Sequence, residues 1–115
     1  MNHGIAGRIA GPPDIPPPPD GLSEDAGRLW RETLARYCFA PSELALVESA
    51  LRSLDRAEAA RALVEAEGLC TTTESSGAVR AHPAIRIENE ARREFRLTWR
   101  VLGLVDPSGL QEASR

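Results

Sequence analysis

The sequence has no lysine and only two histidines and two cysteines, and these shortages exclude several kinds of active site. Cys38 and Cys70 do not form a Cys-x-x-Cys spacing, and with His3 and His82 they give no metal-ligand cluster. No serine has a credible histidine and aspartate partner set, and no glycine-rich phosphate loop is present. We therefore expect no catalytic residues, no metal and no cofactor. The sequence predicts a binding or assembly protein, not an enzyme.

Long hydrophobic runs are also missing. No N-terminal apolar run has the length of a signal peptide, and no segment approaches the roughly 20 apolar residues of a membrane span. The two cysteines suit free thiols in a reducing compartment. We expect a protein that makes no membrane contact and stays soluble in the cytoplasm of the cell that makes it.

The length of 115 residues predicts one domain. The formal net charge of the chain is −3, which argues against a protein that coats DNA through a uniformly basic surface. The charge is unevenly distributed, because residues 80–100 hold six arginines against three glutamates, whereas residues 42–67 hold six acidic residues against three arginines. Such segments can pair within one molecule or head to tail between copies. The use of arginine alone favours bidentate contacts to carboxylate or phosphate, although coding bias in a GC-rich genome explains it equally well.

The first 21 residues are predicted to form a proline-rich N-terminal arm. Pro12, Pro13 and the run Pro16–Pro19 leave little that could build a core, so polyproline II or disorder is expected over 1–21. This segment is expected to be a plain arm that leads into the domain. The functional alternative is that it binds to a proline-binding groove of another protein. A helical domain is predicted over 22–105, and 106–115 is predicted to be a flexible tail.

Three helices and a β-hairpin are expected in the domain, which makes it mainly α. Ser23 is a good N-cap for a first helix reaching Tyr37, and Pro41 opens a long second helix that runs to Gly68. Residues 69–81 favour a β-hairpin, because threonines, a turn and a second β-prone stretch follow one another. The long helix is expected to form an antiparallel hairpin arm.

The third helix is expected from His82-Pro83 to the stop signal at Gly103, after which Leu104 can fold back on the last turn. Its predicted apolar face is composed of Ile87, Ala91, Phe95, Thr98 and Leu102. A second stripe of Arg92, Arg96 and Arg100 has only Glu88 placed to pair with Arg92. The ordinary explanation of such a stripe is a helix face exposed to solvent. The functional explanation is a surface that binds phosphate or another protein.

Two sets of residues are candidates for binding. The candidate DNA contacts are the third-helix arginines Arg92, Arg96 and Arg100 and the first-helix arginines Arg28, Arg31 and Arg36. The candidate contacts between copies are Leu51, Leu54, Ala57, Val64, Phe95 and Trp99.

The sequence resembles the small terminase subunit of tailed bacteriophages, in the branch found with long-tailed phages and prophages. The resemblance covers about Pro16 to Pro107. It rests on the prolines Pro16–Pro19 before the first helix, on Leu22 with Ala26 and Trp30, and on the long helix that ends at Gly68. The most distinctive motifs are His82-Pro83-Ala84 at the start of the last helix, and Leu102-Gly103-Leu104 followed by Pro107 at its end. Two departures from the family pattern are the lack of an aromatic residue in the long helix after Phe39 and the lack of an arginine at Ser108-Gly109-Leu110.

The resemblance implies a mostly α-helical protomer that assembles into a homo-oligomeric ring. The ring would bind double-stranded viral DNA near the packaging start site and regulate the large terminase subunit, which carries the ATPase and nuclease. Two alternatives remain open at this point. One is a helix-turn-helix regulator built from the first two helices, although the second helix begins Ser42-Glu43 instead of with base-reading residues. The other is a helical oligomeric adaptor with no nucleic-acid role.

Overall fold

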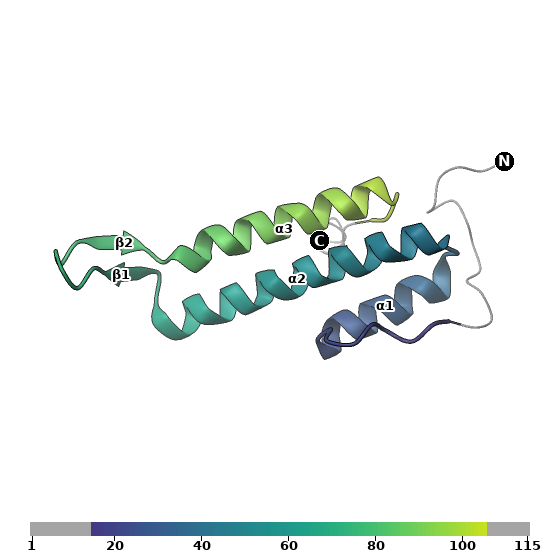
Figure 1. Cartoon of the computed structure of the whole chain (residues 1–115), viewed down its shortest axis with the longest axis horizontal. Coiled ribbons are helices and arrows are strands. Elements are labelled where there is room, and N and C mark those ends of the chain that lie inside the picture. Colours follow the sequence, from purple (N-terminus) through teal and green to yellow (C-terminus); the bar gives the residue numbers. More distant parts are fainter. Residues whose placement is uncertain (1–14, 106–115) are drawn as a thin grey trace, which may run out of the picture.

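The computed structural model describes residues 15–105, which form three helices and one β-hairpin (Figure 1). The elements are α1 (Glu24–Arg36), α2 (Pro41–Glu67), β1 (Cys70–Thr72), β2 (Val79–Ala81) and α3 (Pro83–Val101). The predicted mainly α fold with a long helix and a short antiparallel hairpin is confirmed. The part of the predicted arm up to residue 14 and the predicted tail 106–115 lie outside the described residues.

The helix ends follow the local signals of the sequence. The Ser23 side chain accepts a hydrogen bond from the backbone N–H of Ala26, and two acidic residues occupy the first turn of α1. Gly68 ends α2 with a φ of 94°, and Gly103 follows α3 with a φ of 79°, a region that glycine enters without steric cost. The N–H of Leu104 then bonds to the carbonyl of Trp99, and Leu104 is buried.

The α2 and α3 helices run antiparallel, side by side, and the β-hairpin extends this pair at one end (Figure 1). Three side-chain contacts fix their register: Glu67 with His82, Glu58 with Arg92 and Arg56 with Glu94. The α1 helix lies along α2 near the opposite end of the molecule. The result is elongated, with extents of 61, 32 and 24 Å.

The apolar core is concentrated where all three helices meet. Its largest members are Trp30, Leu34, Val47, Leu51, Phe95, Trp99, Leu102 and Leu104. The rings of Phe95 and Trp99 are stacked with centroids 4.9 Å apart. Beyond α1, the α2–α3 pair holds a separate small cluster of Ala60, Val64 and Ala84, with Ile85 packed against it. The far end of the molecule is therefore a two-helix arm with little apolar volume of its own.

The chain before α1 packs on the helical domain. The indole Nε1–H of Trp30 donates to the carbonyl of Pro16 at 2.9 Å, and a guanidinium nitrogen of Arg52 donates to the carbonyl of Asp20 at 3.0 Å. Gly27 on α1 lies against the ring of Pro18. Within the described part of the chain, no helix is long and apolar enough to cross a membrane.

Candidate nucleic-acid interface

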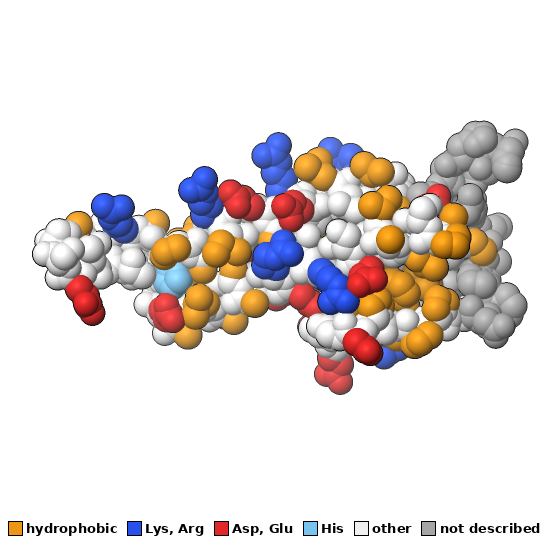
Figure 2. Space-filling model, viewed as in Figure 1, with side chains coloured by type: hydrophobic (Ala, Val, Ile, Leu, Met, Phe, Trp, Pro, Cys, Tyr) orange, Lys and Arg blue, Asp and Glu red, His pale blue; other side chains and the backbone are white. Residues whose placement is uncertain are grey.

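The outer surface of α3 carries four exposed arginines. Arg86, Arg93 and Arg100 are seven residues apart and lie on one line of the helix, with spacings of about 10.5 Å. Arg96 lies beside this line, and Arg80 is exposed on β2. Figure 2 shows basic side chains along the edge formed by β2 and α3. We name Arg80, Arg86, Arg93, Arg96 and Arg100 the arginine row.

Most of the arginine row has no carboxylate partner. Among residues 15–105, Arg80, Arg93, Arg96 and Arg100 form no ion pair. Arg86 Nε lies 3.3 Å from Glu90 Oε2, but both side chains are largely exposed, so this contact is weak. The positive charge along this edge is therefore largely uncompensated within residues 15–105.

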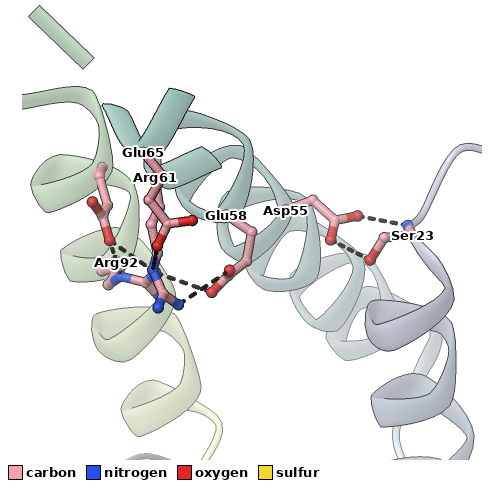
Figure 3. Close-up of polar contacts among 7 residues, drawn as sticks. Ser23, Asp55, Glu58, Arg61, Glu65 and Arg92 are labelled. Carbon is pink, nitrogen blue, oxygen red and sulfur yellow. Dashed lines mark hydrogen bonds and ion pairs between the residues drawn. The ribbon is translucent and has the colours of Figure 1, made fainter. Parts of the chain in front are cut away.

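Arg92 differs from its neighbours, because its guanidinium lies between α2 and α3. Its Nη2 is 3.0 Å from Glu58 Oε2 and 2.9 Å from Glu88 Oε2, and its side chain is 27% exposed (Figure 3). Burial lowers the pKa of Arg92, but hydrogen bonds and charge from Glu58 and Glu88 outweigh burial and raise the pKa above its ordinary value. The structure thus gives Arg92 a contact that joins two helices and leaves it outside the arginine row. The sequence pointed to the pair with Glu88 but not to Glu58.

The candidate arginines of α1 lie on a surface of mixed charge. Arg28 Nη2 is 2.9 Å from Asp25 Oδ1, and Arg31 and Arg36 are exposed without an ion pair among the described residues. Across the helix, three arginines are balanced by three acidic residues, Glu24, Asp25 and Glu32. The α1 surface is therefore a weaker electrostatic match for phosphates than the edge of β2 and α3.

The residues predicted to contact other copies lie mostly inside the protomer. Buried against the chain's own helices are Leu51, Ala57, Val64, Phe95 and Trp99, and Leu54 is half-buried against the main core. Their burial within one chain needs no second copy. Of the predicted apolar face of the third helix, Ala91, Phe95 and Leu102 are buried, whereas Ile87 is 45% exposed. Ala84 and Trp99 complete the buried face.

Exposed apolar side chains mark another face of the α2–α3 pair. Arg56 Nη1 and Glu94 Oε1 are 3.3 Å apart across the two helices. Leu63 is seven residues after Arg56 on α2, and Ile87 is seven residues before Glu94 on α3, so the antiparallel register brings Leu63 level with Ile87. The side chains of Leu63 and Ile87 are 44% and 45% exposed. Val101, seven residues beyond Glu94, is 74% exposed. We name Arg56, Leu63, Ile87, Glu94 and Val101 the hairpin face. Its seven-residue spacing is present in the sequence, although it was not among the predictions above.

A groove of about 830 Å³ lies between α1 and α2, and its charged lining is acidic. Asp25, Glu32, Asp55 and Glu58 line it against the single arginine Arg28. Asp55 accepts hydrogen bonds from the backbone N–H of Ser23 at 2.8 Å and from its hydroxyl at 2.5 Å (Figure 3). Such a lining repels phosphate, so the groove is no DNA site. Within residues 15–105, no group of three or more His, Cys, Asp or Glu side chains is placed to hold a metal ion.

Comparison of the chain with protein-family models, with curated proteins and with solved structures finds no match.

Proposed function

We propose that this chain is a small terminase subunit of a long-tailed bacteriophage or prophage, acting in the cytoplasm of the bacterial host. Its role would be to bind double-stranded viral DNA near the packaging start site and to present that DNA to the large terminase subunit. The ATPase and nuclease belong to that partner, and the effect of this chain on them is positional. The proposal rests on the resemblance in sequence and on the distribution of charge described above.

The arginine row is the observation that carries the DNA-binding part of the proposal. Guanidinium groups suit phosphate because their planar N–H forks bind its oxygens bidentately. Four of the five members have no carboxylate to compete with phosphate among residues 15–105. The line from Arg86 to Arg100 extends over about 21 Å, enough to meet several phosphates of one duplex. The rest of the described surface offers no comparable concentration of unpaired positive charge.

Assembly into a ring would use other surfaces. The hairpin face combines exposed aliphatic side chains with an ion pair, a mixture suited to contacts between proteins. A ring would place several arginine rows around or along one duplex. Weak binding by each copy would then combine into a higher overall affinity for DNA.

The DNA-binding proposal is tested by the salt dependence of binding. Replacing Arg93, Arg96 and Arg100 together by Gln removes three candidate phosphate contacts and leaves the Arg92 contacts intact. The log–log slope of affinity against salt should fall by about 0.9 for each phosphate that the variant no longer binds, or nearly three in total. Fluorescence anisotropy with a labelled duplex, measured over a series of NaCl concentrations, gives that slope.

A matched control carries Arg28, Arg31 and Arg36 changed to Gln, which alters the net charge by the same amount on α1. We expect this variant to keep most of the slope. If the variant with Arg93, Arg96 and Arg100 changed loses its oligomeric state but keeps the salt slope, the arginine row is an interface between copies. That result would contradict the proposal. Failure of the unaltered protein to bind duplex DNA would leave the adaptor as the better explanation, and a dimer specific for a promoter would favour the regulator.

A further inference from the structure

The β-hairpin is longer and more exposed than a connection between two antiparallel helices requires. Such helices are commonly joined by two to eight residues, whereas here residues 68–82 separate α2 from α3. No residue from Gly68 to Ala81 is buried. Two strands of three residues are marginally stable in water by themselves. A projecting ribbon of this kind is best explained by a partner outside the protomer.

The two faces of the ribbon differ in chemistry. Thr71 is paired with Arg80, so their side chains stand on the same face, whereas Thr72 and Val79 stand on the other. Thr71 offers a hydroxyl that can donate and accept, and Arg80 offers a fork of donors with no carboxylate partner among residues 15–105. These are side chains that read base edges, with Arg binding guanine bidentately and Thr contacting several bases.

The ribbon is also continuous with the arginine row. Arg80 is the one basic residue of the ribbon, and the basic side chains continue from β2 along α3 in Figure 2. A duplex held by Arg86, Arg93 and Arg100 would therefore pass beside the ribbon. A two-stranded ribbon fits the major groove of B-DNA, which is about 12 Å wide. Glu74, the acidic residue of the turn, would be repelled by phosphate but can accept a hydrogen bond from a cytosine amino group at a base edge.

We propose that the ribbon of residues 69–81 enters the major groove and reads sequence there, with Arg80 and Thr71 contacting base edges. The arginines of α3 contact phosphates and set the position of the duplex. This inference rests on the proposed DNA-binding function and adds to it the element that confers sequence specificity. Phosphate contacts position a protein, and base contacts specify the site, so the two roles can be separated by experiment.

The test is selection of bound duplexes from a pool of random sequence, carried out with the full chain. The unaltered protein should enrich a consensus, and Arg80→Gln should reduce the preference for that consensus over the unselected pool by about 5- to 150-fold, the range for one bidentate base contact. Thr71→Val should relax the preference at a neighbouring position. Arg86→Gln is the matched control in the same row: it should weaken all sequences equally and leave the preference unchanged.

Circular dichroism should show the same helix content in all variants, since these side chains are exposed or only partly buried. Methylation of guanine N7, which lies in the major groove, should block binding of the consensus by the unaltered protein. Binding of DNA without an enriched consensus would overturn the inference and leave the proposed function standing. Equal weakening of all sequences by Arg80→Gln would make Arg80 a phosphate contact and overturn it as well. Absence of any DNA binding would overturn both.

Discussion

His82 joins the end of α2 to the start of α3 through one side chain. Its Nδ1 accepts a hydrogen bond from the backbone N–H of Ala84 at 3.0 Å, and its Nε2 lies 2.7 Å from Glu67 Oε1. Because Nδ1 accepts, these partners assign the hydrogen of the neutral ring to Nε2, which donates to the carboxylate. The side chain is 5% exposed. His82 thus caps α3 and ties it to the end of α2.

Replacing His82 by Ala should lower the free energy of unfolding by about 1–3 kcal/mol, because the change removes the cap and the contact with Glu67. Urea denaturation followed by circular dichroism measures this decrease. His82→Asn retains an acceptor that can cap the helix and should be less destabilising. Glu67→Gln keeps an oxygen to accept from Nε2 and serves as a further control. A His82→Ala protein as stable as the unaltered chain would exclude the capping role.

At the scale of elements, the α2–α3 contact is built largely on small side chains. Ala50, Ala57 and Ala60 on α2 are buried, as are Ala84 and Ala91 on α3. Alanine lets two helices approach closely, and a close-packed contact has no room for added methylene groups. The arm beyond α1 depends on this packing, since its own apolar cluster is small.

Ala57→Leu should therefore destabilise the protein by about 1–3 kcal/mol through overpacking. Ala62→Leu makes the same chemical change at an exposed site of the same helix and should have little effect. The midpoints and slopes of urea unfolding curves compare the two variants. Equal stability of both would show that the helices separate readily at Ala57, which would contradict a close-packed contact.

At the scale of the whole molecule, the elongated shape leaves the hairpin face uncovered. Leu63 and Ile87 lie level with each other beyond the Arg56–Glu94 ion pair, and Val101 extends the apolar positions on the other side of Glu94. Exposed aliphatic side chains in this regular arrangement favour contact between copies.

We expect the unaltered chain to form a large oligomer at micromolar concentration and moderate salt. The double change Leu63→Gln and Ile87→Gln should shift it toward monomers without loss of helix content, since both side chains are partly exposed. Native mass spectrometry and sedimentation velocity measure the assembly. The control, Leu69→Gln with Val79→Gln, removes exposed apolar side chains from the β-hairpin and should leave the oligomer intact. A monomeric unaltered protein would remove the ring from the proposal.

The positions of the helix ends could be predicted from the sequence because their causes are local. Ser23 caps α1 with its own side chain, Pro41 and Pro83 stand at the starts of α2 and α3, and Gly68 and Gly103 supply the positive φ that ends a helix. The β-hairpin followed from its threonines and turn residues for the same reason. Each of these signals acts within a few residues, so no knowledge of the packing was needed.

The roles of neighbouring residues on α3 were decided only by the tertiary structure. Successive residues point about 100° apart around a helix, so the position of α2 determines which side is buried. That position turns Arg92 toward Glu58 and leaves Arg93 exposed, although the sequence pattern groups Arg92 with Arg96 and Arg100. It likewise buries Trp99, a predicted interface residue, and exposes Ile87, a member of the predicted apolar face. Sequence periodicity identifies the faces of a helix, but the neighbouring helix selects the one that is buried.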